Sequence, residues 1–179
     1  LMKFSQGGEK EVISLQGGGR DLLFPHHFMT EIQARALYGR DFARHFVHCG
    51  MIGYQGEKMS KSLGNLVFAS KLVDSGIEPM AIRIALLLNH YRSDREWSDQ
   101  LLKEGQRILD KTRRALGREF VPDYHDVVQQ MSKALSDDLD TPRFFQIFDQ
   151  YLDSALVGTE EVTPGALSRY LDAVVGLAL

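Results

Sequence analysis

The sequence predicts a mostly α-helical chain in which a remnant of an α/β domain is followed by a helical bundle. Two observations lead to this prediction. Before residue 50, a β-type run, a helical stretch and a second β-type run follow one another as in a βαβ unit of a parallel sheet. From about Phe68 onward every segment has a helical pattern.

The elements of the α/β part are bounded by glycine and proline. Residues 11–15 form the first expected strand, which runs into a turn at Gly17–Gly19. A helix is expected after Pro25, and Gly39 ends it. The second strand is expected at residues 45–49.

The helices of the second part begin at prolines. Glu78–Pro79, Thr141–Pro142 and Thr163–Pro164 each pair a possible N-cap with a proline suited to the first helical turn. The helix from Pro79 is apolar almost all round, so we expect it to be buried. Amphipathic helices are expected near residues 99–118, 123–136, 142–157 and 164–177.

Length and composition exclude several classes of protein. The chain has 179 residues, 44% hydrophobic and 25% charged, which is typical of a globular protein and argues against disorder. It contains no apolar run long enough to predict a membrane span. Its one cysteine, Cys49, cannot form an internal disulfide, which fits a cytoplasmic location. Residues 1–4 are typical of the end of an apolar helix, so we expect the chain to be a fragment of a longer protein.

Charge is distributed unevenly along the chain. Residues 1–118 carry a net charge of +5, and residues 119–179 carry −8. Because an acidic segment repels phosphate, we expect no nucleic acid to lie across the second region. A basic stripe on the helix near 99–118 is expected to be a solvated face, with contact to RNA phosphates as the alternative. The stripe comprises Lys103, Arg107, Lys111, Arg114 and Arg118.

The most specific motif is KMSKS at residues 58–62, on a loop after the second strand. Two lysines three residues apart, with hydroxyls between them, can wrap a polyphosphate and neutralise charge as it leaves. Such a string recurs by chance only about once in a million positions. The loop therefore indicates a nucleotide site rather than an ordinary solvated loop.

This loop resembles the ATP loop of class I aminoacyl-tRNA synthetases. Residues 17–27 (GGGRDLLFPHH), 61–65 (KSLGN) and 89–93 (NHYRS) resemble one branch, the cysteinyl-tRNA synthetases and the related mycothiol ligases. The resemblance implies that residues 1–66 are the C-terminal part of a Rossmann-type catalytic domain with its KMSKS loop. It implies a connecting helical region at 67–118, and a C-terminal helical bundle at 119–179.

Two differences favour the ligases over the synthetases. Gln16 stands where synthetases usually have histidine, and residues 28–30 (FMT) depart from the synthetase pattern after the paired histidines. Residues 44–53 (RHFVHCGMIG) resemble the ligases directly. In both enzymes the HIGH motif lies upstream, so the partner of this chain would be the missing N-terminal half of the same enzyme.

The resemblance implies a role for each residue that matches the family's motifs. Gly19 admits the nucleotide, and the Asp21 carboxylate accepts hydrogen bonds from ribose hydroxyls. The backbone of Met51 and Ile52 contacts adenine. The KMSKS loop holds ATP, taken with Mg²⁺, and its pyrophosphate leaving group. The loop residues expected to do so are Lys58 and Lys61, as catalytic lysines, with Ser60 and Ser62.

The resemblance also implies zinc, which binds the thiolate of the cysteine substrate. His26 matches the family's histidine ligand, whereas Thr30 stands where synthetases have a glutamate. Both cysteine ligands lie upstream in the family, so we expect no bound metal in the chain alone. Cys49 is expected to be a buried thiol, and His27 a packing or capping residue. His48 is a further candidate for the lining of the nucleotide pocket.

The activity implied for the full-length enzyme joins cysteine to ATP as cysteinyl-adenylate and passes the cysteinyl group to the amine of glucosaminyl-inositol. The fragment alone is expected to be inactive. Two alternatives remain open from the sequence. The chain could belong to a cysteinyl-tRNA synthetase, which transfers cysteine to tRNA, or to a non-catalytic protein that keeps the loop as a nucleotide-binding module.

Overall fold

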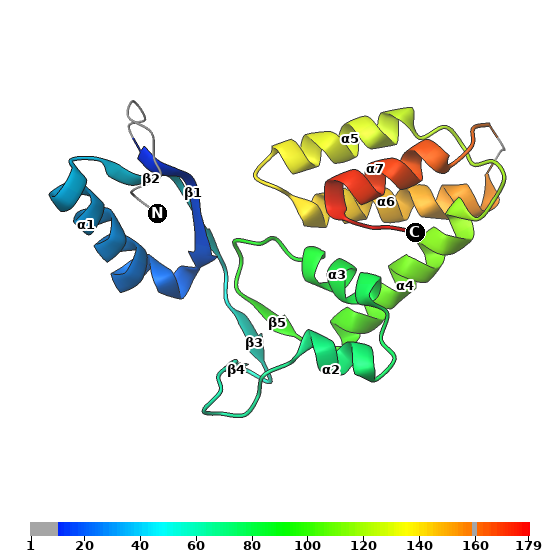
Figure 1. Ribbon diagram of the computed structural model, residues 1–179. Helices are drawn as coiled ribbons and strands as arrows, with labels where there is room; N and C mark the ends of the chain where they lie inside the picture. Colours follow the sequence, from blue (N-terminus) through cyan, green and yellow to red (C-terminus); the bar gives the residue numbers. More distant parts are fainter. Residues whose placement is uncertain (1–10, 159–160) are drawn as a thin grey trace. The chain divides into compact units, whose positions relative to one another are not determined.

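The computed structural model describes residues 11–158 and 161–179 (Figure 1). The chain forms two compact units. Of the described residues, the first unit contains those up to Gly53 together with Tyr91–Glu96, and the second contains Tyr54–His90 and those from Trp97 to Leu179. An α/β segment followed by a helical bundle is therefore confirmed. The helix end expected at residues 1–4 lies outside the described residues.

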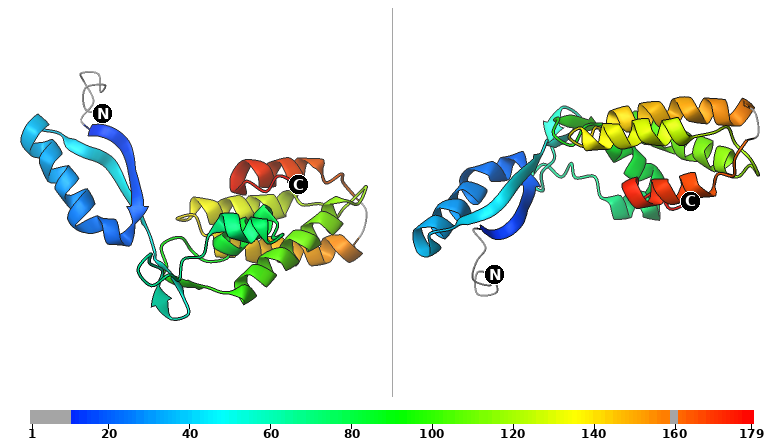
Figure 2. Two further views of the ribbon diagram at one scale, coloured as in Figure 1. Left: turned by 60° about the horizontal axis from the view of Figure 1, so that its bottom comes forward. Right: turned by 90° about the horizontal axis from the view of Figure 1, so that it is seen from above.

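The first unit is the predicted βαβ unit. Strands β1 (Glu11–Gly19) and β2 (Asp41–Cys49) pair in parallel, in register from Glu11 opposite Asp41 to Gly19 opposite Cys49. Helix α1 (Phe28–Tyr38) connects them, and Figure 2 shows it lying along the strand pair. The helix ends at Gly39, whose φ of 62° is the left-handed conformation that glycine adopts without strain.

Three boundaries in this unit differ from the prediction. The glycines at 17–19 continue β1 as far as Gly19 instead of forming a turn, because β2 pairs with each of them. A 3₁₀ turn (Arg20–Leu22) and a π-helical turn (Leu23–His27) follow, so α1 begins at Phe28 instead of directly after Pro25. Strand β2 begins at Asp41, four residues before the predicted start.

A second sheet has three short strands in the order β4-β3-β5. Strands β3 (Ile52–Tyr54) and β4 (Glu57–Lys58) lead into the KMSKS loop. Strand β5 (Arg95–Trp97) lies within the region predicted to be wholly helical, so that prediction is wrong at this point. Its three residues form β structure because they pair with β3, a partner more than 40 residues away in the sequence.

The second unit is a helical bundle. It contains α2 (Ala69–Asp74), α3 (Pro79–Leu87), α4 (Asp99–Leu116), α5 (His125–Ser136), α6 (Thr141–Val157) and α7 (Gly165–Val175). Phe144, Phe148 and Leu152 of α6 are completely buried at the centre of the core. The ring of Phe144 stacks on that of Tyr170 in α7, and the Tyr170 hydroxyl lies 2.8 Å from that of Ser132 in α5. These contacts join α5, α6 and α7.

The predicted helix starts are partly confirmed. Helix α3 begins at Pro79 behind Glu78, and it buries four residues on its apolar surface. The N-cap of α6 is Asp140 rather than Thr141, because the Asp140 carboxylate accepts a hydrogen bond of 3.0 Å from the backbone N–H of Arg143. Helix α7 begins one residue later than expected, and Pro164 rather than Thr163 is its N-cap.

The basic stripe on α4 is not a simple solvated face. Lys103 and Arg114 are exposed as predicted, but Lys111 is only 5% exposed. Its ammonium group donates to Asp149 of α6, and the guanidinium group of Arg118 donates to two carbonyl oxygens in the last turn of that helix. The prediction is wrong at these two positions because helical spacing shows which residues share a face but not which helix covers it.

The structure also bears on membrane insertion. No helix among residues 11–158 and 161–179 has both the length and the apolar surface needed to cross a bilayer.

Candidate functional site

Three of the expected nucleotide-binding residues come together in the first unit, where both parallel strands end. Gly19 closes β1, and Met51 follows the end of β2. A Cβ atom placed on Gly19 would lie 2.5 Å from Asp21 Oδ1 and 3.8 Å from Met51 Sδ. Any larger residue at position 19 would therefore displace the Asp21 carboxylate. The carboxyl ends of parallel strands are also where α/β sheets bind their ligands.

The backbone of Met51 is held by the segment that returns to the first unit. The Met51 N–H donates to Asp94 Oδ1 at 2.7 Å, and the Met51 carbonyl accepts from the Arg95 N–H at 2.9 Å. Ile52 begins β3 directly after it and is half-buried. Both backbone groups of Met51 are thus bonded within the chain, while its thioether faces Gly19.

The histidines form a chain of contacts that the sequence pattern did not predict. His27 is buried, as expected of a packing residue, and its Nδ1 lies 2.8 Å from His48 Nε2. Its Nε2 lies 3.0 Å from the amide nitrogen of Gln16. Because an amide NH₂ only donates, His27 Nε2 accepts, so Nδ1 carries the proton and donates it to His48.

Burial lowers the pKa of His27, and the neighbouring His48 and His26 lower it further. His27 is therefore neutral near pH 7, which suits the donor and acceptor pattern of this chain. Gln16, at the position where the sequence was expected to differ from the synthetases, is thus a direct partner of His27, the second of the paired histidines. This contact could not be predicted from the sequence pattern, because His27 lies 11 residues from Gln16 along the chain.

The described residues do not by themselves form a zinc site. His26 is exposed, and its carbonyl accepts a hydrogen bond of 2.8 Å from the Thr30 hydroxyl. Within the described part of the chain, no three His, Cys, Asp or Glu side chains are grouped so that they could hold a metal ion. A single imidazole does not fit the three or four ligands that zinc needs, so we assign no chemical step to zinc here.

The expectation that Cys49 is a buried thiol is wrong, because its side chain is exposed. Among the described residues, Cys49 is the last residue of β2 in a sheet of two parallel strands. A strand end in so small a sheet has few neighbours that can cover it.

The KMSKS loop lies in the second unit and is held by Asn65. The Asn65 side-chain oxygen accepts from the Ser60 N–H at 2.9 Å, and its amide nitrogen donates to the Lys58 carbonyl at 3.3 Å. Gly64, with a φ of 66°, makes the turn that brings Asn65 back to the start of the loop. The sequence did not predict that Asn65 holds the loop, although the turn residue Gly64 before it was a signal.

Within the loop the hydroxyl groups of Ser60 and Ser62 lie 3.1 Å apart. The Ser60 hydroxyl also accepts from the Leu63 N–H at 3.3 Å. Lys58 and Lys61 are both exposed. The loop therefore presents two ammonium groups and two hydroxyls on a turn that the chain itself closes.

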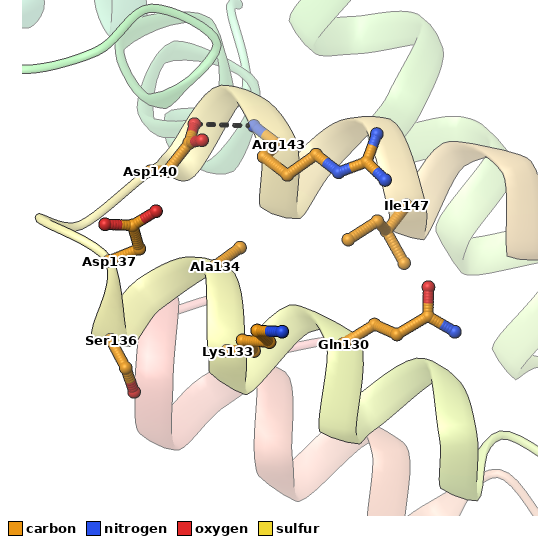
Figure 3. Close-up of a pocket in the computed structure, with 8 residues that line it drawn as sticks. All are labelled: Gln130, Lys133, Ala134, Ser136, Asp137, Asp140, Arg143 and Ile147. Atoms are coloured by element: carbon orange, nitrogen blue, oxygen red, sulfur yellow. Dashed lines mark hydrogen bonds between the residues drawn. The ribbon is translucent and has the colours of Figure 1, made fainter.

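A separate hollow of about 540 Å³ lies between α5 and α6 (Figure 3). Its lining carries charges of both signs, from Lys133 and Arg143 and from Asp137 and Asp140. Asp140 caps α6, and the Arg143 guanidinium donates to Gln146. No expected site residue lies in this hollow. The residues that line it are Gln130, Lys133, Ala134, Ser136, Asp137, Asp140, Arg143 and Ile147.

Comparison with known proteins identifies the family. Residues 2–107, more than half of the chain, match the family model described as the tRNA synthetases class I (C) catalytic domain. The chain belongs to this class I synthetase family. The matched residues include the end of β1 with Met51 in the first unit and the KMSKS loop in the second.

Several curated relatives of this family member carry one name, L-cysteine:1D-myo-inositol 2-amino-2-deoxy-alpha-D-glucopyranoside ligase. The protein of that name from Streptomyces griseus is 49% identical over 92% of this chain. Those from Salinispora arenicola and Rhodococcus erythropolis are each 46% identical, over 93% and 92% of the chain. The resemblance to the ligases is thereby confirmed. The chain spans about 41% of the length of each of these three relatives.

Solved structures confirm the fold. A leucyl-tRNA synthetase from Agrobacterium radiobacter, in a ternary complex with tRNA, matches 90% of this chain and 26% of its own. The TM-score is 0.62 at 16% identity. A methionyl-tRNA synthetase from Mycobacterium tuberculosis, bound by methionyl-adenylate, matches 89% of this chain and 34% of its own. Here the TM-score is 0.55 at 17% identity, so these two matches speak for the class I synthetase fold alone.

Proposed function

We propose that the protein containing this chain ligates L-cysteine to the amine of glucosaminyl-inositol at the expense of ATP. The observation that carries the proposal is the 49% identity, over 92% of this chain, to a relative named as that ligase. The reaction has two steps. A carboxylate oxygen of cysteine attacks the α-phosphorus of ATP and displaces pyrophosphate. The amine nitrogen then attacks the carbonyl carbon of cysteinyl-adenylate, loses a proton and displaces AMP.

This chain contributes the nucleotide side of that reaction. Gly19 leaves room for the ribose, and Asp21 accepts hydrogen bonds from its hydroxyls. The segment Met51–Ile52 lies against the adenine, with the Met51 thioether directed toward the Gly19 turn. The proposal is supported by the closeness of these residues at the carboxyl ends of β1 and β2.

The KMSKS loop acts on the leaving group. Negative charge builds up on the β-phosphate as the bond to the α-phosphorus breaks. Lys58 and Lys61 are the cations that meet this charge, while Ser60 and Ser62 donate hydrogen bonds to phosphate oxygens. Asn65 closes the loop in advance, so little ordering remains to be done when ATP binds.

The selection of cysteine and the binding of the acceptor are assigned to regions beyond the described residues. Zinc, with His26 as one ligand, and Mg²⁺ bound to ATP remain implications of the resemblance. We also propose that the chain alone is inactive, since its named relatives are more than twice as long. ATP and a reduced thiol as substrates favour the cytoplasm.

A cysteinyl-tRNA synthetase activity is the second candidate, because the matching family model is named for tRNA synthetases. It shares the first step and differs only in the acceptor. The best sequence feature for RNA contact was the five-residue basic stripe on α4, and two of its members, Lys111 and Arg118, are engaged with α6. The amino sugar therefore remains the preferred acceptor.

The deciding experiment offers both acceptors at once. The protein as it occurs in its host is supplied with ATP, Mg²⁺, zinc and labelled cysteine, together with glucosaminyl-inositol and tRNA. We expect label to appear on the amino sugar. Label on tRNA would mean that the synthetase interpretation is right, and formation of neither product would support a non-catalytic module.

The role of the loop is tested in the same protein by exchange of labelled pyrophosphate into ATP. We expect Lys61→Ala to lower the exchange rate by about 100-fold, the size of effect typical of a lost transition-state contact. Lys103→Ala removes another exposed lysine, from α4, and serves as the control. Unchanged exchange in Lys61→Ala would contradict the role given to the loop.

A further inference from the structure

Asp94 connects two parts of the nucleotide site. Its two carboxylate oxygens have different partners. Oδ1 accepts the Met51 N–H at 2.7 Å, and Oδ2 accepts from Arg20 Nη1 at 3.0 Å. Arg20 stands between Gly19 and Asp21, so this one carboxylate holds both the segment expected against adenine and the turn expected around the ribose.

Neighbouring contacts fix the carboxylate in place. A second guanidinium nitrogen of Arg20 donates to the Arg92 carbonyl at 2.8 Å. The Gly50 N–H donates to the Tyr91 carbonyl at 2.8 Å. A Cβ atom on Gly50 would collide with the backbone of Ser93 and Asp94, so glycine at position 50 permits the close approach of this segment.

Stability alone does not account for this arrangement. The side chains of Arg20 and Asp94 are 51% and 58% exposed, and an exposed ion pair adds little to folding free energy. The same pair, however, sets the distance between the Gly19–Asp21 turn and Met51. A displacement of about 1 Å in a binding site is enough to weaken binding markedly.

We propose that Asp94 is a positioning residue for ATP, acting through Arg20 on the ribose turn and through the Met51 N–H on the adenine segment. This inference rests on the proposed function, which places adenosine at these residues. Asp94 itself does not touch the nucleotide. It sets ATP affinity and leaves the chemical step and cysteine binding unchanged.

The structure offers a control ion pair at the start of β2. Arg35 and Asp41 form an ion pair of 2.9 Å with side chains 64% and 54% exposed, close to the values for Arg20 and Asp94. Asp41 begins β2, whereas Met51 follows its end. Asp41→Ala therefore removes an exposed ion pair from the end of β2 opposite the nucleotide site, where Arg35 keeps Glu31 as its other partner.

The test measures cysteine-dependent pyrophosphate exchange in the protein as it occurs in its host. For Asp94→Ala we expect the KM for ATP to rise about fivefold to tenfold, because the variant loses binding that is equally strong in the ground state and in the transition state. The kcat, the KM for cysteine and the unfolding midpoint should stay near wild type. Asp41→Ala should change none of these. An unchanged KM for ATP in Asp94→Ala, or an equal rise in Asp41→Ala, would overturn the inference.

A double-variant cycle tests the coupling. If Asp94 acts partly through Arg20, the combined Asp94→Ala and Arg20→Ala protein should bind ATP more tightly than the product of the two single effects predicts. Independent effects would contradict the coupling. If the wild-type protein shows no exchange, the proposed function fails separately. Equilibrium dialysis with labelled ATP then still compares Asp94→Ala with wild type, and equal affinity would refute the role of Asp94.

Discussion

The buried lysine of α4 provides the sharpest test of how the bundle is held together. Lys111 is 5% exposed, and its ammonium group donates to the Asp149 carbonyl at 2.9 Å and to Asp149 Oδ1 at 2.8 Å. It also lies 2.7 Å from Asp153 Oδ1. The perturbation is Asp149→Ala, which removes one carboxylate and leaves the ammonium group buried.

The expected cost follows from these contacts. Loss of one partner from a fully buried ion pair costs about 3–5 kcal/mol. The Asp149 side chain is 28% exposed, and the backbone carbonyl and Asp153 still accept from the ammonium group, so the cost is reduced. We expect Asp149→Ala to lower the free energy of unfolding by about 2–3 kcal/mol. This is close to the cost of losing one hydrogen bond to a charged group that stays buried.

Two controls separate this mechanism from simple loss of a contact. Lys111→Met places an apolar chain of similar length in the same space and should change stability by less than about 1 kcal/mol. Asp153→Ala removes a carboxylate whose side chain is 73% exposed and should also cost less than about 1 kcal/mol. Urea unfolding followed by circular dichroism at 222 nm measures the free energy of unfolding of all three variants. The reasoning is refuted if Lys111→Met destabilises more than Asp149→Ala.

Three further predictions use the same structure. A Cβ on Gly105 would collide with the Ala81 carbonyl, so Gly105→Ala should lower the free energy of unfolding by about 1–3 kcal/mol. The control is Gly165→Ala, which should not lower it, because no heavy atom lies nearer than 3.7 Å to a Cβ placed there. Equal urea midpoints for the two variants would contradict this prediction. Asn65→Ala frees the start of the KMSKS loop and should lower the kcat of pyrophosphate exchange about tenfold without changing the unfolding midpoint. Burial raises the pKa of Asp149, but the hydrogen bonds from Arg107 and Lys111 outweigh it, so the pKa falls below its ordinary value. The ionised Asp149 therefore stabilises the fold fully above the unfolded aspartate pKa of about 4, and this stabilisation is lost as the pH falls through the lower folded pKa. The difference in unfolding free energy between wild type and Asp149→Asn should therefore become smaller in urea titrations at acid pH.

Much of the fold could be predicted because it depends on short stretches of chain. The order of strand, helix and strand, the helix stop at Gly39 and the helix start at Pro79 all follow from local conformational preferences. The KMSKS motif could also be recognised from the sequence, because all its residues lie within five consecutive positions. The residue roles derived from it remain predictions.

Other features depend on partners far away in the sequence. Residues 95–97 form a strand only because β3 lies beside them. Which member of the basic stripe is buried was decided by α6, where Asp149 lies 38 residues from Lys111. The exposure of Cys49 likewise follows from its place at the end of a two-stranded sheet.

The sequence by itself therefore determined the family, the parallel βαβ unit, the helical bundle and the lysine loop, because each is encoded by contiguous residues with their own spacing. The tertiary structure alone decided that Asp94 joins Arg20 to Met51, that Gln16 contacts His27, and that Lys111 is buried against Asp149. The physical reason is that a side chain's partner is set by which elements pack together, and residues 74 positions apart, such as Arg20 and Asp94, become neighbours only in the folded chain.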